Sequence, residues 1–298
     1  MNQFITAVLT SLSSGAIYAL MSISLVLVWR STRVVNFAQA GQAVLTTFIG
    51  YEVTVRSGSY WIGLIAAVIS GAVVGAIIDR FFMRPIFKRV KSGPIVMIAP
   101  VVATLGLLGL IQAIIGFIWG FTYVSIEAPV STDGYNLFGT VVAFSPFNLM
   151  VLVAVTIAML LLTLLFQKTN IGLALRASAF SPEIARLSGI KVDAVRTLGW
   201  AIAGAAGGLA GMLYIPSSYL YPNAMDVLLV FGFVAAVIGG LESLFGAVAG
   251  AMILGFAISF ATSYVSEKLV FPMAFIMLIV VLLIRPAGLF SKRKSRRD

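Results

Sequence analysis

Nine stretches of this chain contain no charged residue, and most of them are long enough to cross a lipid bilayer. They are residues 1–29, 34–51, 57–78, 92–126, 134–167, 197–225, 227–241, 243–266 and 269–284. The hydrocarbon core of a bilayer is about 30 Å thick, and a helix needs roughly 20 apolar residues to cross it. Two of the stretches, 227–241 and 269–284, are shorter, but long flanking side chains can reach the interface. The pattern predicts an all-α polytopic membrane protein.

The composition excludes a soluble protein and most kinds of catalysis. Hydrophobic residues make up 60% of the 298 residues and charged residues only 10%, so we expect a single transmembrane domain over residues 1–298. The chain has no Cys and no His, which excludes disulfides, thiolate or imidazole metal sites and catalysis by either side chain. Walker-type phosphate loops, HExxH and GxSxG are also absent. We therefore expect no enzymatic activity, no metal and no bound cofactor in this chain.

The basic residues indicate which side of the membrane each connection faces. The net charge is +10, and every Lys and Arg except Arg56 and Lys268 falls within four segments. These segments are 30–33, 80–91, 168–196 and 285–297. Because cytoplasmic connections of membrane proteins carry the excess of Lys and Arg, we place all four in the cytoplasm, next to the lipid headgroups. Topology then accounts for the charge, which does not predict nucleic-acid binding.

This assignment predicts nine crossings, with the N-terminus outside and the C-terminus in the cytoplasm. The helices are expected at about 5–29, 36–56, 60–81, 95–119, 147–167, 194–215, 226–241, 244–264 and 268–285. The longer cytoplasmic connections are then a loop at 82–94, a segment at about 168–193 and a basic tail at 286–298. If the segment 36–56 were re-entrant, the chain would cross eight times and the residues before it would change sides.

The cytoplasmic segment 168–193 contains the pattern of a short, capped helix. Ser181 is a good N-cap, Pro182 suits the first helical position, and Glu183 suits the first turn because its charge complements the helix dipole. Gly189 stands where a glycine commonly ends a helix. The pattern predicts a helix over residues 181–188.

The same short helix has an apolar face. Ile184 and Leu187 are three positions apart and share this face, while Arg186 points elsewhere. Spacing alone leaves two roles open for the face. It could lie on lipid headgroups, or it could dock a cytoplasmic partner.

Two further motifs allow both a structural and a functional interpretation. Asn36, Phe37 and Gln39 open the second predicted helix, where Asn36 can cap the helix and Gln39 can form an interhelical hydrogen bond. The alternative is that these residues contribute to a transport pathway. Gly239 and Gly240 suit a tight turn that needs a positive φ, and a functional role for them is again the alternative.

Glycine pairs spaced four residues apart recur in the predicted helices. They are Gly71 and Gly75, Gly204 and Gly208, Gly207 and Gly211, and Gly246 and Gly250. In lipid, small residues at this spacing let helix backbones approach closely. We expect these pairs to pack helices together, with a role in a moving interface as the alternative.

The positions of the acidic residues near the spans limit the ways in which this chain could be energised if it is a transporter. All of them lie at the ends of predicted helices: Glu52, Asp79, Asp226 and Glu242. No charged residue is predicted in the middle of a helix, where a carboxylate or cation could run a proton or sodium cycle. A transporter of this kind therefore needs energy supplied from outside the chain.

Several motifs spread over about residues 5–290 resemble one family of membrane proteins. They are Gly15 to Leu20, Asn36-Phe37-Ala38, Gly172 through Arg176-Ala177 to Ser188-Gly189-Ile190, Gly239-Gly240 with Gly246 and Gly250, and Arg285 to Phe290. In this order and spacing they resemble the LivH-type permease subunit of bacterial ABC importers for branched-chain amino acids. The chain begins at its first helix, without the longer N-terminal region of the LivM-type partner, and this also favours the LivH type.

The resemblance implies a multi-pass permease in the bacterial cytoplasmic (inner) membrane. It would pair with a second, LivM-type permease, two ATP-binding subunits that hold ATP and Mg, and an extracytoplasmic solute-binding protein. ATP would close the ATPase dimer, and the two permeases would then alternate access for the solute. The residues implied to couple the chain to its ATPase are Arg176, Ser181, Pro182, Glu183, Ile184, Leu187 and Gly189. The candidates for the pathway or for helix packing are Asn36, Phe37, Gln39, Gly204, Gly208, Gly239 and Gly240.

A stand-alone secondary carrier or channel for a small neutral or zwitterionic solute is the main alternative. It would require an ionisable residue within the membrane, or uptake by this chain alone. An integral membrane enzyme would need a convergent set of catalytic residues, and none is visible. The sequence does not distinguish branched-chain amino acids from other amino acids, amides or urea as the solute. It also leaves open whether the permease pair is a homodimer or a heterodimer.

Overall fold

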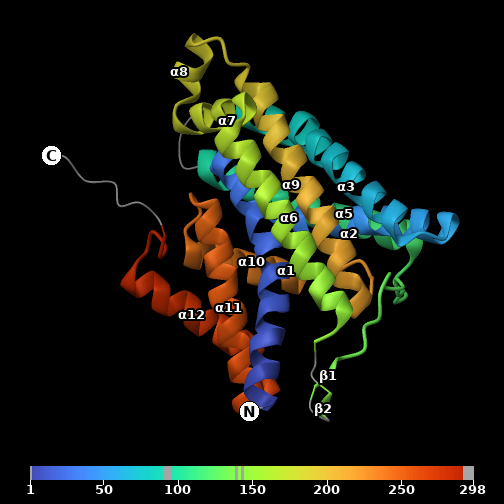
Figure 1. Ribbon diagram of the computed structural model, residues 1–298. Coiled ribbons are helices and arrows are strands. Elements are labelled where there is room, and N and C mark those ends of the chain that lie inside the picture. The colour runs from blue at the N-terminus through green and yellow to red at the C-terminus, as the bar shows by residue number, and fades with distance from the viewer. Residues whose placement is uncertain (1, 90–94, 138–139, 142–143, 291–298) are drawn as a thin grey trace.

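The computed structural model describes residues 2–89, 95–137, 140–141 and 144–290, and this part of the chain is almost entirely helical (Figure 1). The helices are α1 (Asn2–Thr32), α2 (Gln39–Ser57), α3 (Tyr60–Ile77), α4 (Arg84–Arg89), α5 (Ile95–Trp119), α6 (Pro146–Lys168), α7 (Asn170–Phe180), α8 (Pro182–Leu187), α9 (Val192–Tyr214), α10 (Asp226–Gly239), α11 (Leu244–Tyr264) and α12 (Val270–Ile284). The strands β1 (Asn136–Leu137) and β2 (Thr140–Val141) form a small antiparallel pair. The all-α prediction is confirmed.

Seven helices within the described residues are long and apolar enough to cross a membrane. They are Gln3–Thr32, Tyr60–Arg89, Ile98–Trp119, Pro146–Lys168, Val192–Ser217, Leu244–Tyr264 and Glu267–Ile284. The other two predicted crossings are helices that fall short by this measure. α2 has 19 residues but is more polar, since it includes Gln39, Gln42, Glu52 and Arg56. α10 is apolar but has only 14 residues. The chain is thus a multi-pass helical membrane protein.

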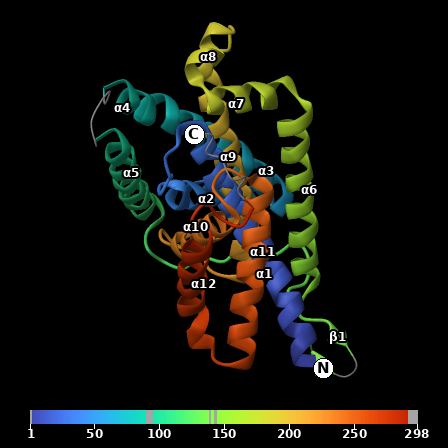
Figure 2. The same cartoon turned by 90° about the vertical axis from the view of Figure 1, so that its left-hand side faces the viewer.

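Helix α1 lies at the centre of the bundle. It packs against α11, α9, α10 and α6, and Leu20, Met21 and Val26 on it are fully buried. α5 and α6 lie on opposite sides of the molecule (Figure 2). The outward faces of α5, α6 and α12 expose rows of Ile, Leu, Val and Phe side chains, as expected for helices that face hydrocarbon.

Glycines set the closest helix contacts. A Cβ on Gly204 of α9 would overlap the carbonyl oxygen of Gly71 on α3, and a Cβ on Gly208 would overlap that of Ala67. Between α10 and α11, Gly239 and Gly246 approach each other in the same way. Because only hydrogen fits between these backbones, the packing interpretation of the glycine pairs agrees with the structure.

The helix that begins with α3 is longer than the sequence predicted. We expected it to end at residue 81, before a loop at 82–94. Instead it continues through a π-helical turn, Ile78–Met83, into α4 and reaches Arg89. The prediction of a loop over 82–89 was wrong because the charges there do not end the helix, and Asp79 is buried rather than placed in solvent. Residues 90–94 lie outside the described residues.

Long-range contacts gather the helix ends into two groups. In one group, Arg33 pairs with Glu242 at the α10–α11 turn, and the backbone N–H groups of Leu289 and Phe290 donate to Ile238 and Gly239. This group includes α7 and α8 (Figure 1).

In the second group, the Trp119 indole donates to Glu52 and the Gln112 amide donates to Asp226, at 3.1 and 2.8 Å. The N-terminus lies at the end of the molecule opposite to α8 (Figure 1).

Candidate functional site

The segment that follows α6 folds into two short helices with side-chain caps. The Thr169 hydroxyl accepts a hydrogen bond from the Gly172 N–H at 3.1 Å and begins α7. The Ser181 hydroxyl accepts one from the Ile184 N–H at 3.4 Å and begins α8, whose first residue is Pro182. Gly189 has a φ of 82°, the left-handed conformation that a glycine adopts at low cost. The predicted capped helix is therefore confirmed, with Glu183 in its first turn.

Helix α8 presents an exposed apolar surface. Ile184 is 61% exposed, and Leu187 and Phe180 are each 89% exposed. Figure 2 shows α7 running from α6 towards α8, and α8 projecting from that end of the molecule. Phe180 was missed in the sequence because it is the last residue of α7, a helix that we had treated as loop. The available signal was a large apolar residue directly before the Ser181 N-cap. Large apolar side chains exposed outside the long helices are candidates for an interaction surface.

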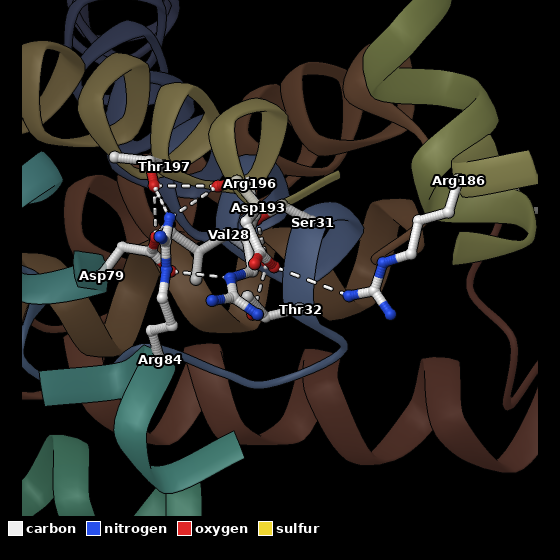
Figure 3. A network of polar contacts seen from close by, with 9 residues as sticks. All are labelled: Val28, Ser31, Thr32, Asp79, Arg84, Arg186, Asp193, Arg196 and Thr197. Carbon is white, nitrogen blue, oxygen red and sulfur yellow. Dashed lines mark hydrogen bonds and ion pairs between the residues drawn. The ribbon is translucent and has the colours of Figure 1, made fainter. Parts of the chain in front are cut away.

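An exposed ion pair connects α8 to the start of α9. Arg186 lies 3.6 Å from the Asp193 carboxylate, and both side chains are largely in solvent. The backbone carbonyl of Asp193 accepts a hydrogen bond from Arg84 at 2.9 Å and lies 2.9 Å from the Thr197 hydroxyl oxygen. Figure 3 shows this chain of contacts running from α8 to the α3–α4 helix.

The network ends on a buried carboxylate, Asp79, which is fully inaccessible to solvent. Its oxygens accept hydrogen bonds from Arg196 Nε at 2.8 Å and from the Thr197 hydroxyl at 2.6 Å. Arg84 lies 3.7 Å away and also donates to Thr197 Oγ1 at 2.8 Å (Figure 3). Arg196 also lies over the ring of Phe87, with its Cζ 5.2 Å from the ring centroid. Two guanidinium groups on different helices thus converge on one carboxylate.

The π-helical turn places this carboxylate. Asp79 lies within Ile78–Met83, and the wider turn brings Asp79 and Arg84 together at a spacing of five residues. We had placed Asp79 at the end of a predicted helix and took it to be an ordinary end residue. The missed signal is the run of charges Asp79, Arg80 and Arg84 on a helix that continues past them.

The residues that open α2 are buried between helices. Asn36 and Gln39 are fully buried, and the Asn36 amide donates to Gln39 Oε1 at 3.2 Å. The Gln39 amide in turn donates to the Ala203 carbonyl of α9 at 3.0 Å. Phe37 packs against Phe233, with ring centroids 6.2 Å apart. Asn36 does not cap α2, because Ala38 occupies the N-cap position.

A row of polar residues on α2 faces the glycines of α9, and the sequence analysis had not singled it out. Gln42, Thr46 and Thr47 are fully buried. A Cβ on Gly204 would overlap the Gln42 amide, and one on Gly208 would lie 3.2 Å from Thr46 Oγ1. Gly204 and Gly208 therefore provide room for polar side chains as well as for the α3 backbone.

The glycine pair at the α10–α11 turn has two separate roles. Gly239 ends α10 and packs on Gly246, while Gly240 has a φ of 102°. Arg176, on α7, is exposed, and its Nε donates to the Gly172 carbonyl at 3.4 Å. The structure brings the residues of α7 and α8 together at one end, which also holds the Gly239–Gly240 turn, and leaves the α2 candidates, Gly204 and Gly208 inside the bundle. No group of residues that could hold a metal occurs in the described ranges.

The bundle and the projecting α8 define the class: a multi-pass helical membrane protein with a capped helical segment outside its long helices. The family model for the permease component of the branched-chain amino acid transport system matches residues 7–284. The chain therefore belongs to this family of permeases, and the resemblance seen in the sequence motifs is confirmed.

Individual relatives agree with the family match. A probable branched-chain amino acid transport permease protein, LivH, of Methanocaldococcus jannaschii is 32% identical over 79% of this chain and 74% of its own length. The high-affinity LivH permease protein of Salmonella typhimurium is 26% identical over 97% of this chain and 96% of its own length. The solved structure of PsaBC from Streptococcus pneumoniae in complex with Fab covers 96% of this chain and 93% of that chain, with 14% identity and a TM-score of 0.52. This last similarity concerns the fold alone.

Proposed function

We propose that this chain is a LivH-type permease subunit of an ATP-driven importer in the bacterial cytoplasmic membrane. It passes amino acids, with branched-chain amino acids as the first candidates, from an extracytoplasmic binding protein to the cytoplasm by alternating access. The family match and the relatives' names favour this function over a stand-alone carrier. The observation that carries the ATP-driven part is the set of exposed apolar side chains at the end of α7 and on α8, namely Phe180, Ile184 and Leu187.

The proposed topology has nine crossings, with α2 and α10 as the two shorter ones. Contacts at each end of the bundle support it, since Arg33 pairs with Glu242 at one end and Glu52 accepts from Trp119 at the other. The first end holds the described basic residues that we assign to the cytoplasm. The basic tail 286–298 would lie at this same end, although its residues 291–298 are outside the described ranges.

Helix α8 is the proposed ATPase-coupling element. Its exposed apolar side chains would insert into a groove of an ATP-binding subunit, which holds ATP and Mg. Movement of α8 passes to α9 through the short connection at 188–191, and then to α3 through the contact of Gly71 with Gly204. The buried Asp79 network ties the same two helices at their ends.

The remaining partners follow from the importer assignment. A second, LivM-type permease would complete the pathway, and the exposed faces of α5, α6 and α12 are available for it or for lipid. The binding protein would approach the opposite end from α8. There Tyr123 packs with Tyr219 and Tyr221, and Tyr123 and Tyr219 are exposed. Desolvation, with smaller contributions from Tyr123 and Tyr214, raises the pKa of the Tyr221 phenol. We propose no nucleic-acid partner.

Substituting Asp for the exposed residues of α8 tests the coupling role. We expect Ile184→Asp and Leu187→Asp each to lower uptake at least tenfold and to prevent copurification of the ATP-binding subunits. Membrane insertion should be unchanged, because neither side chain packs in the bundle. The matched control for copurification of the ATP-binding subunits is Val265→Asp, which places the same charge at an apolar side chain that is 74% exposed in the α11–α12 connection, at the end opposite α8.

The alternative role of α8, an anchor on lipid headgroups, predicts a different result. In that case the ATP-binding subunits would still copurify with Ile184→Asp, and only the amount of protein in the membrane would fall. Normal uptake by either α8 variant would rule out docking through this surface.

A further inference from the structure

A cavity of about 480 Å³ lies beside α7 and the α10–α11 turn, and its lining includes Arg176, one of the residues that the family resemblance implies for ATPase coupling. It is bounded by the end of α1, one face of α6, α7, the α10–α11 turn and the residues after α12. Its charged lining residues are Arg30, Arg176 and Glu242. Polar groups from Thr163, Gln167 and Ser243 complete the hydrophilic part of the lining.

The charges around the cavity favour an anion. Glu242 is engaged by Arg33, which lies next to the cavity. Among the described residues, Arg176 makes a hydrogen bond only within its own helix, at 3.4 Å, and Arg30 lies over the ring of Phe166 at 5.4 Å from its centroid. The described groups here thus contain more guanidinium than carboxylate. Arg binds phosphate well because its planar fork can donate two parallel hydrogen bonds.

A helix N-terminus adds to this positive field. α11, which is 21 residues long, begins at Leu244 on the cavity wall. Its N-cap, Ser243, accepts from the Gly246 N–H at 2.9 Å. The N-terminal end of a helix carries a partial positive charge that attracts phosphate.

The other part of the lining is apolar and opens to the outer surface. Met159, Phe166 and Leu244 line the interior, and Phe245 and Phe290 pack edge to face with ring centroids 5.7 Å apart. Phe245 is 72% exposed. A free anion would leave this apolar surface uncovered, whereas a ligand with a phosphate group and hydrocarbon chains would match both parts.

We propose that the cavity binds one anionic glycerophospholipid. Its phosphate would lie between Arg30 and Arg176, and its acyl chains would run over Phe245 and along the outer face of α6. This assignment rests on the proposed topology, which places this end of the bundle at the cytoplasmic leaflet. The bound lipid would hold α7 against the α10–α11 turn, next to the projecting α8.

Lipid binding to the purified full-length chain in mild detergent tests the proposal directly. Native mass spectrometry would measure retention of phosphatidylglycerol, phosphatidylcholine and diacylglycerol. We expect phosphatidylglycerol to bind most tightly and diacylglycerol not to be retained. Arg176→Gln should weaken phosphatidylglycerol binding about tenfold, since hydrogen bonds to a charged group are among the stronger ones. Arg30→Gln should act in the same direction.

The matched control is Arg56→Gln, because Arg56 is 81% exposed and lies in the last turn of α2. No residue of α2 is among the described residues that line the cavity. It should leave phosphatidylglycerol binding unchanged. Arg30 is partly buried, so if Arg30→Gln does not fold, the exposed Arg176 carries the test. Equal retention of phosphatidylglycerol and diacylglycerol, or an unchanged affinity in Arg176→Gln, would overturn the proposal.

Two further outcomes distinguish lipid binding from a free-anion site and from the importer mechanism. Inorganic phosphate that competes for the cavity as strongly as the lipid would show a free-anion site and overturn the lipid assignment. The binding assay needs no ATP-binding subunit, so failure of the α8 variants to uncouple uptake would rule out docking through α8 and leave lipid binding standing. If the chain still transports but shows no lipid selectivity, only the proposal that the cavity binds an anionic lipid is refuted.

Discussion

Replacing Asp79 by Asn should lower the free energy of unfolding by about 3 kcal/mol. The carboxylate is fully buried and accepts from Arg196 and Thr197 at 2.8 and 2.6 Å. Removing one partner of a buried ion pair costs about 3–5 kcal/mol because it leaves an uncompensated charge. We expect the lower end, since the Arg196 and Arg84 side chains retain 14% and 24% exposure and Arg84 lies 3.7 Å away.

Equilibrium unfolding of the purified chain in mixed micelles measures this change. Arg56→Gln serves as the control, because its pair with Glu52 at 3.4 Å is 81% exposed on the Arg side. An exposed pair contributes about 0–1 kcal/mol, so the two variants should differ by at least about 2 kcal/mol.

A double variant distinguishes a true charge network from simple loss of packing. Asp79→Asn combined with Arg196→Gln removes one of the charges that the single variant leaves unpaired. The cost should therefore be clearly smaller than the sum of the two single changes. Strict additivity, or a loss below about 1 kcal/mol in Asp79→Asn, would refute the argument that this carboxylate neutralises buried guanidinium groups.

Three further changes test the packing and the caps. Gly204→Val should destabilise the chain by about 1–3 kcal/mol, because the α3 backbone fills the space, whereas Gly106→Val, with open space around it, should change the same unfolding measurement little. Gly240→Ala should cost about 1–3 kcal/mol in that assay, since its φ of 102° strains any residue with a Cβ. Ser181→Ala should lower the local stability of α8 by about 1 kcal/mol, seen as faster amide hydrogen exchange of Ile184, with global unfolding unchanged.

The positions of the helices could be predicted because each stretch of chain in lipid must satisfy its own backbone hydrogen bonds, and this depends on the local sequence alone. A span without charge must be helical in lipid, so each predicted helix coincides with an observed one to within a few residues at most ends. The exceptions arise where polar side chains find hydrogen-bond or ion-pair partners inside the protein. The second helix begins at Gln39 rather than 36, and the third continues past 81, because Asp79 and Arg84 find partners in α9.

The site could be predicted only where its determinants are close in sequence. The cap of α8 depends on Ser181, Pro182 and Gly189, which lie within nine residues, and it was predicted correctly. The burial of Asp79 depends on Arg196, which is 117 positions away. The role of Gln42 likewise depends on Gly71, whose carbonyl accepts from its amide at 3.4 Å. No spacing within one helix reveals such partners.

The energies of these contacts decide how movement at α8 can reach the helices. The side chains of the Arg186–Asp193 pair are 61% and 42% exposed, so the pair contributes about 0–1 kcal/mol to stability. It is too weak to transmit movement from α8 to α9 by itself. The chain connection into α9 is short, and α9 then meets α3 through backbones that touch at Gly71 and Gly204. Because such a contact has no compressible side chains, and the buried Asp79 clamps the same helices, α3 and α9 must move as one body. In the proposed mechanism, we therefore expect the pathway to open at faces of this pair that meet other helices, and α2, whose buried glutamines lie against α9 and α3, is the first candidate.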